Sequence, residues 1–314
     1  MPLPGNPPLV TVFGGGGFIG RYVCEALIKA GVRLRVAERD PRKAFFLQPL
    51  GQVGQIGTVR ADLTRPETVA RAVAGAAAVI NLVGSFTGDL DAIHAAGAGH
   101  AAAAAREAGA SAFVHISAIG ADPQAASDYG RTKGLGERAV RDAFPGATII
   151  RPSVVFGPED DFTNRFASMA RLPFLPVIAP NTRFQPIFVR DLGRAIAMAA
   201  LDPQRHGAKS YDLAGPEALT MRELNRRIAA MAGQSPELVE VPDFVASGMA
   251  KFGFLPGAPL SSDQWKMLQR DNVAAEGASG LDAFGIVPTP LEAVAPEWLG
   301  RFVSGGRFAA RATA

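Results

Sequence analysis

A phenol and an ammonium group occur four residues apart in the segment 129–133, which reads Tyr-Gly-Arg-Thr-Lys. On a helix, Tyr129 and Lys133 lie on one face. The positive charge is expected to lower the pKa of the phenol toward the working range of a general acid. Such a pair also arises by chance, but the chain has only three tyrosines. We therefore predict that Tyr129 and Lys133 form an acid–base pair, positioned by elements that bring a ligand to them.

Three glycines occupy the turn between an expected strand at 9–13 and an expected helix at 20–30. Gly14 permits a tight turn, Gly17 lets the backbone approach a pyrophosphate, and Gly20 lets the helix pack closely on the sheet. The phosphates would lie at the positive end of the helix. Glycine loops also serve as plain turns, but the flanking strand and helix favour dinucleotide binding. The residues assigned to this loop are Gly14, Gly17, Phe18, Ile19 and Gly20.

Apolar runs alternate with helical patterns through the first half of the chain, which is typical of a parallel sheet covered by helices on both faces. The expected strands are 9–13, 34–37, 58–61, 78–83, 112–117, 148–155 and 210–213, and the expected helices are 20–30, 90–108, 129–143, 191–201 and 221–232. We predict an α/β protein with a Rossmann-type doubly wound parallel sheet. A dinucleotide-binding domain spans 1–156, with 184–213 packing back onto it, and 157–314 form a smaller C-terminal substrate-side region.

Polar residues and glycines follow two of the expected strands. Asp62 and Leu63 would offer a carboxylate and a backbone amide to an adenine, although an aspartate in such a loop is also a common turn former. Asn81, Val83 and Gly84 lie at the carboxyl end of the next strand, where sheets of this kind bind ligands. The glycine would leave room for a ribose.

The end of the second strand selects between the two nicotinamide dinucleotides. Glu38 would accept hydrogen bonds from a free ribose 2′-hydroxyl, whereas Arg39 would pair with a 2′-phosphate. The alternative is that both are solvated surface charges. We favour NADP(H) as the cofactor, and NAD(H) remains open. Lys133 would also bind the nicotinamide ribose.

Composition excludes several classes of function. The chain is 48% hydrophobic and 19% charged with a net charge of +3, which is typical of a folded globular protein and does not favour nucleic acid as a partner. A single cysteine excludes an internal disulfide, and the four histidines lack the spacing of metal ligands. We see neither a signal peptide nor a transmembrane segment. We expect a cytoplasmic protein, with peripheral attachment to the cytoplasmic face of the inner membrane left open.

At these motifs the sequence resembles the short-chain dehydrogenase/reductase superfamily, in its extended or atypical branch. Within that branch it is similar to the nucleotide-binding accessory subunit of respiratory complex I, NADH:ubiquinone oxidoreductase, and its bacterial relatives. The superfamily likeness also includes 151–158 (Arg-Pro-Ser-Val-Val-Phe-Gly-Pro) and 186–191 (Pro-Ile-Phe-Val-Arg-Asp). The segments that carry the closer likeness are 47–54 (Leu-Gln-Pro-Leu-Gly-Gln-Val-Gly), 140–145 (Val-Arg-Asp-Ala-Phe-Pro) and 156–171.

The resemblance implies a tightly bound NADPH in a mainly structural or assembly role, with complex I subunits as partners. It implies that Arg39 faces the 2′-phosphate, that Tyr129 and Lys133 contact the nicotinamide ribose, and that Pro152 and Ser153 contact the nicotinamide ring.

One position departs from the catalytic members of the superfamily. They usually carry a Ser or Thr shortly after the fifth strand to polarise a carbonyl, and here the only such residue in the segment 115–120 is Ser117, two residues early, with Ile119 at the expected place. We retain Ser117 as a catalytic and cofactor-binding candidate. The alternative function is an NADP(H)-dependent reductase, epimerase or dehydratase acting on a small molecule, with Tyr129 as acid and base.

Overall fold

The computed structural model describes residues 7–251 and 260–303, which fall into two compact units. The first unit consists of the chain up to Pro152 together with Val189–Leu213 and Gly277–Ile286. The second consists of Ser153–Phe188, Ala214–Glu276 and the chain from Val287 onward. The glycine loop and the pair Tyr129 and Lys133 therefore belong to one unit.

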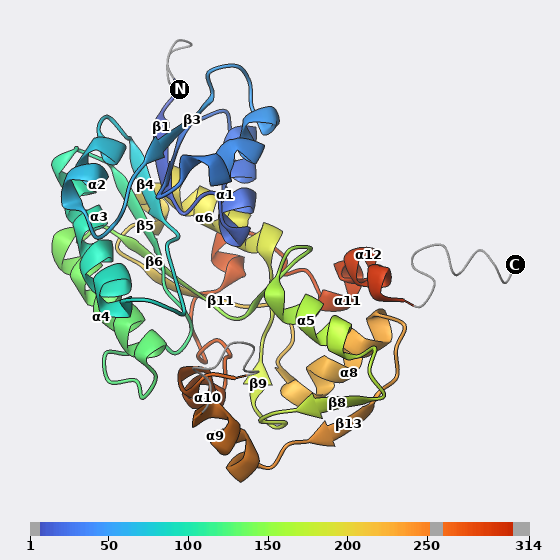
Figure 1. Cartoon of the computed structure of the whole chain (residues 1–314). Helices are drawn as coiled ribbons and strands as arrows, with labels where there is room; N and C mark the ends of the chain where they lie inside the picture. Colours follow the sequence, from blue (N-terminus) through green and yellow to red (C-terminus); the bar gives the residue numbers. More distant parts are fainter. Residues whose placement is uncertain (1–6, 252–259, 304–314) are drawn as a thin grey trace, which may run out of the picture. The chain divides into compact units, whose positions relative to one another are not determined.

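A seven-stranded sheet forms the centre of the first unit, in the order β11-β6-β5-β4-β1-β2-β3 (Figure 1). Every pairing in it is parallel, which confirms the predicted Rossmann-type sheet. The strand order reverses between β1 and β4, the kind of point at which open α/β sheets bind ligands. The strands are β1 Leu9–Phe13, β2 Arg33–Glu38, β3 Ile56–Arg60, β4 Ala78–Asn81, β5 Ala112–Ile116, β6 Thr148–Pro152 and β11 Ser210–Leu213.

Helices cover both faces of this sheet (Figure 1). Helices α1 (Phe18–Lys29) and α6 (Val189–Leu201) pack together on one face, and α2 (Pro66–Val73), α3 (Gly97–Glu107) and α4 (Asp128–Ala143) follow one another on the other face. The shorter segments are η1 Pro41–Leu50, η2 Asp91–Ala96, α7 Pro203–His206 and η3 Leu281–Phe284.

Several elements differ from the sequence prediction, and the strands expected at 78–83 and 112–117 end at Asn81 and Ile116. Helix α2 was not expected; it begins with Pro66 in its first turn, where a missing N–H costs nothing. The helix expected at 90–108 begins instead as the π-helix η2, a form that is frequent at functional sites. The strand expected at 148–155 ends at Pro152, because Val155–Phe156 (β7) pairs with Ile187–Phe188 (β10) in a separate two-stranded sheet.

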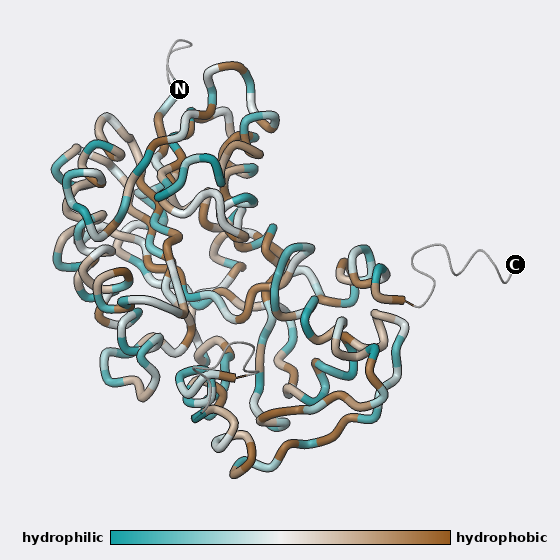
Figure 2. The backbone as a smooth tube through the Cα atoms, viewed as in Figure 1, coloured by the Kyte–Doolittle hydropathy of each residue, from teal (hydrophilic) through white to brown (hydrophobic). Residues whose placement is uncertain are grey.

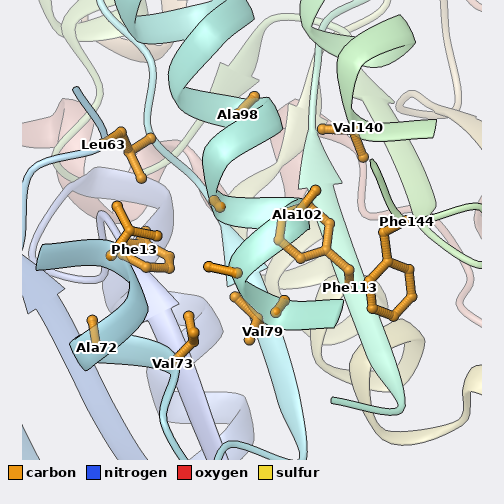
Figure 3. Packing of buried hydrophobic residues seen from close by; sticks show 14 of the residues in the cluster. Phe13, Leu63, Ala72, Val73, Val79, Ala98, Ala102, Phe113, Val140 and Phe144 are labelled. Carbon is orange, nitrogen blue, oxygen red and sulfur yellow. The ribbon is translucent and has the colours of Figure 1, made fainter. Parts of the chain in front are cut away.

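The core between the sheet and α2, α3 and α4 combines large and small side chains. Figure 3 shows Phe13, Val79 and Phe113 of the strands facing Ala98 and Ala102 of α3. The alanines let α3 lie close to the sheet, while the two phenylalanines fill the space beside them; each contributes about 2–3 kcal/mol by leaving water. In Figure 2, where the tube is coloured by residue hydropathy, hydrophobic residues make up much of the central strands. This packing fixes the carboxyl ends of β1, β4 and β5, from which the candidate site is built.

The second unit carries short strands and helices around two apolar clusters. Phe156, Phe188 and Trp298 form one, with the rings of Phe188 and Trp298 stacked 6.4 Å apart. In the second cluster, Leu175 packs against Ala229. The elements are α5 Asp161–Met169, β8 Phe174–Val177, β9 Arg183–Phe184, β12 Leu219–Thr220, α8 Met221–Met231, β13 Glu237–Glu240, α9 Asp243–Lys251, α10 Ser262–Leu268, α11 Leu291–Val294, α12 Pro296–Leu299 and η4 Gly300–Phe302.

No helix in the described ranges is long and apolar enough to cross a membrane.

Candidate functional site

The glycine loop connects the end of β1 to the start of α1. Gly14 has a φ of +78°, a conformation that favours glycine, and its N–H donates to the carbonyl oxygen of Ala37 over 3.2 Å. A Cβ on Gly20 would lie 2.3 Å from the carbonyl oxygen of Gly14. Only a glycine at position 20 therefore lets α1 approach the loop this closely, as the sequence pattern predicts.

The first turn of α1 fits a phosphate group. No side chain caps its N-terminus, and the N-cap residue Gly17 has extended backbone angles. The first N–H groups of a helix have no partner within the helix, and the helix dipole makes this end positive. A Cβ on Gly17 would meet only the Gly14 oxygen, at 3.3 Å. The fold by itself thus leaves a little room for a side chain at position 17. A ligand lying against the backbone there would take up that room.

Glu38 and Arg39 stand next to this loop at the end of β2. The N–H of Gly16 donates to Glu38 Oε1 over 2.7 Å, and burial raises the pKa of the Glu38 carboxyl. Arg39 is exposed. The carboxylate is therefore already engaged with the loop backbone, while the guanidinium group faces solvent.

Asp62 acts as a turn former in this structure. Its Oδ1 accepts hydrogen bonds from the N–H of Thr64 over 3.0 Å and from the Thr64 hydroxyl over 2.8 Å. Leu63 is buried, and its carbonyl oxygen lies 3.1 Å from Nδ1 of His100. These contacts hold the loop after β3 against α3, and adenine binding at Asp62 and Leu63 stays a prediction.

Asn81 shapes the loop after β4. Its Oδ1 accepts from the N–H of Val83 over 3.1 Å, and its Nδ2 lies 3.3 Å from Nδ1 of His115 on β5. A Cβ on Gly84 would lie 3.5 Å from Nζ of Lys133. Asn81 thereby fixes the loop that contains Val83 and Gly84, and the cofactor contacts predicted for these three residues stay predictions.

Lys133 points from α4 toward the ends of β4 and β5. Its ammonium group donates to the carbonyl oxygen of Ile116 over 2.9 Å and lies 3.5 Å from that of Val83. Burial lowers the pKa of Lys133 to about 8, although the nearby Glu137 carboxylate opposes this shift. The lysine is thus fixed at the strand ends, next to Gly84.

The expected activation of Tyr129 by Lys133 is wrong for this structure. Burial raises the pKa of the Tyr129 phenol to about 12. Burial disfavours the charged phenolate, and the ammonium nitrogen of Lys133 lies 6.0 Å from the centre of the tyrosine ring.

Two aromatic rings enclose Tyr129, and sequence reasoning missed both. Phe86 stacks on it with ring centres 4.6 Å apart, and His94 meets it edge-on at 5.4 Å. His94 Nε2 accepts from the N–H of Ser85 over 3.0 Å, and Nδ1 lies 2.9 Å from the hydroxyl of Thr132. A histidine judged only by metal-ligand spacing gives no sign of this role.

The remaining site residues lie at the ends of β5 and β6. The N–H of Ser117 donates to Ile150, its Oγ is buried, and no described atom makes a hydrogen bond to that oxygen. The carbonyl oxygen of Pro152 accepts from the N–H of Ile119 over 3.1 Å. Ser153 belongs to the second unit, where its hydroxyl bonds to the backbone oxygen of Asn272 over 2.8 Å. Nicotinamide contacts of Ser117, Pro152 and Ser153 stay predictions.

Comparisons with known proteins agree with this geometry. A family model described as NAD(P)H-binding matches residues 14–164. The NADH dehydrogenase [ubiquinone] 1 alpha subcomplex subunit 9 of Mus musculus is 32% identical over 93% of this chain and 80% of its own length. The ceramide reductase of Caulobacter vibrioides is 32% identical over 75% of this chain and 74% of its own length.

A solved structure shares the fold. An NADPH-dependent quinone oxidoreductase from Escherichia coli, solved with NADPH, matches with a TM-score of 0.75 and 20% identity over 91% of this chain and 98% of its own. The glycine loop, the parallel sheet and these likenesses support one conclusion about cofactor and ancestry. This chain belongs to the NAD(P)H-binding family of short-chain dehydrogenase/reductase type that includes subunit 9 of the 1 alpha subcomplex of NADH dehydrogenase.

Proposed function

We propose that this protein holds NADP(H) tightly and that the bound dinucleotide mainly stabilises it for assembly with respiratory complex I. The observation that carries this proposal is the state of Tyr129. Its phenol lies under Phe86, and burial raises its pKa to about 12. A general acid works best with a pKa near the operating pH, so this tyrosine is poorly suited to turnover, whereas the glycine loop keeps the features needed for binding.

The relatives named as NADH dehydrogenase subunits support the same role, because their likeness runs over 93% of the chain. A ligand that binds only the folded state stabilises it by about 4 kcal/mol at a thousandfold excess over Kd. Bound NADP(H) would therefore keep the first unit folded during assembly.

We place the protein in the cytoplasm, attached peripherally to the cytoplasmic face of the inner membrane.

Purification from native membranes in a mild detergent tests this role. We expect the chain to co-migrate with NADH:ubiquinone oxidoreductase activity on a native gel and to release about one NADP(H) per chain on denaturation. Recovery of the chain only from the soluble fraction, with no complex I subunit beside it, would contradict the assembly role.

A reductase acting on a carbonyl compound is the second candidate, and the ceramide reductase relative favours it. A bound NADPH would supply the hydride in such a reaction. Tyr129 would hold the transferable proton on its phenol oxygen, and Lys133, fixed 2.9 Å from the Ile116 oxygen, would orient the cofactor ribose. Oxidation of NADPH followed at 340 nm against a panel of carbonyl compounds, long-chain ones included, tests this alternative.

A further inference from the structure

One histidine makes hydrogen bonds both to the loop after β4 and to helix α4. His94 lies on η2 and is 1% exposed. Its Nε2 accepts the backbone N–H of Ser85 over 3.0 Å. A backbone N–H always donates, so this ring nitrogen carries no proton.

The Nδ1 atom of His94 makes the contact with helix α4. With Nε2 unprotonated, the neutral ring carries its proton on Nδ1, which donates to the Thr132 hydroxyl 2.9 Å away. That hydroxyl in turn donates to the carbonyl oxygen of Asp128 over 2.8 Å. These hydrogen bonds connect Ser85, His94, Thr132 and Asp128 in series, and each has one defined donor and acceptor. They link the loop to the first turns of α4.

Phe86 follows Ser85 directly and covers Tyr129. The two rings lie 21° from parallel with centres 4.6 Å apart, and Phe86 is 62% exposed. One face of the phenylalanine therefore rests on the tyrosine while much of the side chain faces solvent. An exposed aromatic side chain on a loop gains little from burial, so its position depends on the hydrogen bonds that fix the loop.

We propose that His94 is a positioning residue for Tyr129, because it holds Ser85 and Thr132 together and so keeps Phe86 stacked over the phenol. This role goes beyond the proposed function, since it concerns access to Tyr129 whether or not the protein turns over a substrate. Through the Phe86 ring, which stacks on one face of the half-buried Tyr129, the hydrogen bonds of His94 set how much of the tyrosine is exposed.

Nitration of tyrosines by tetranitromethane at pH 8 tests the proposal, with each site followed by peptide mass spectrometry. The reagent attacks the phenolate. A shift of the Tyr129 pKa from about 12 toward the unperturbed value of about 10 raises the phenolate fraction at pH 8 up to about 100-fold. We expect His94→Leu to nitrate at Tyr129 at least about tenfold faster than the unaltered protein. His94→Gln, whose side-chain oxygen can accept from Ser85, should stay near the unaltered rate.

Two internal controls separate positioning from general loosening. Tyr22 and Tyr211 are buried elsewhere in the same unit, at 5% and 2% exposure, and their nitration rates should not change in His94→Leu. Phe86→Ala should expose Tyr129 while leaving His94 intact, and combining it with His94→Leu should add nothing further, since both act on one contact.

The proposal is overturned if Tyr129 is nitrated no faster in His94→Leu, or if all three tyrosines accelerate together, which would make His94 only a contributor to fold stability. Nucleotide content, measured in parallel on each variant, reports on cofactor binding separately. A variant that exposes Tyr129 and retains its nucleotide supports the positioning role independently of what the bound dinucleotide does.

Discussion

The two ends of the candidate site are built from different parts of the chain. At the start of α1 the site is backbone: three glycines and the N–H groups of one helical turn. At the end of β4 and β5 it is side chain: Tyr129 under Phe86, with His94 and Lys133 beside them. Backbone atoms offer a ligand fixed dipoles that do not titrate, whereas buried side chains have pKa values set by their neighbours. We therefore expect binding of the dinucleotide and chemistry on it to be separable by mutation in this protein.

The largest effect on stability is expected at Gly20, because helix α1 packs against the glycine loop at this residue. A Cβ there would lie 2.3 Å from the Gly14 oxygen and 2.6 Å from the carbonyl carbon of Gly15, and these two atoms belong to the backbone of the loop, which cannot move aside. Gly20→Ala should lose about 3 kcal/mol of stability, measured as a drop of several degrees in Tm. Gly248→Ala is the matched control, because a Cβ at position 248 meets nothing within 4 Å, and its Tm should not fall. An unchanged Tm for Gly20→Ala would contradict the close approach of α1.

Gly17→Val should separate binding from folding. A Cβ at this position has 3.3 Å to its nearest neighbour, so the protein should fold, but a branched side chain fills the space that the pyrophosphate needs. We expect the purified variant to release no nucleotide on denaturation and to unfold at a lower temperature than the loaded protein. A variant that still carried one nucleotide per chain would mean that the loop is a plain turn.

Arg39→Ala should change the choice of dinucleotide with little effect on the fold. The exposed guanidinium group is free to meet a 2′-phosphate while Glu38 bonds to Gly16. Losing a charge-assisted hydrogen bond of about 1.5–3 kcal/mol should weaken NADPH binding about 10- to 100-fold and leave NADH binding nearly unchanged. Arg138→Ala removes the same charge from an exposed position on α4 and should alter neither Kd. Equal affinities of the unaltered protein for both cofactors would instead favour Glu38 as the ribose ligand.

The side-chain end should respond to pH. Burial, assisted by the charge of Lys133 and opposed by Asp91, lowers the pKa of His94 from 6.5 to about 4. Between these values the unfolded chain takes up a proton that the folded protein does not, so stability falls as pH drops through this window. His94→Gln, which cannot take up that proton, should lose about 2 kcal/mol less than the unaltered protein between pH 7 and pH 4. If the free energy of unfolding falls equally with pH in the two proteins, His94 is not the source of the pH dependence.

The sequence predicts the backbone end better than the side-chain end, and the reason is physical. Glycine spacing between a strand and a helix constrains the backbone itself, so the positions of Gly14 and Gly20 follow from the pattern. The pKa of Tyr129 does not, because it depends on burial of the phenol, and Phe86 and His94, whose rings contact Tyr129, lie far from it in the sequence. Strands 9–13 and 210–213 match the prediction residue for residue. The first is a mainly buried apolar run, and in the second the apolar and buried residues alternate with polar ones, which is a strand pattern.

Some of the second half of the chain follows from local signals and some does not. The helix expected at 221–232 is α8, and Thr220 caps it by accepting from the N–H of Glu223. Asp160 is buried and accepts from the N–H of Thr163 as the N-cap of α5, a helix that the sequence prediction lacks. A cap can be predicted only together with the helix that follows it, so without a helix at 161–169 the role of Asp160 is not predicted.

The most direct test of the separation between binding and chemistry is the Tyr129→Phe variant, assayed for bound nucleotide and for turnover of NADPH. The change removes one hydroxyl and keeps the ring that stacks on Phe86. We predict about one nucleotide per chain, a stability within about 1 kcal/mol of the unaltered protein, and unchanged NADH:ubiquinone oxidoreductase activity in the host. If the variant keeps its fold and cofactor but loses several orders of magnitude of an NADPH-dependent conversion that the unaltered protein performs, the structural role is wrong and the protein is a reductase.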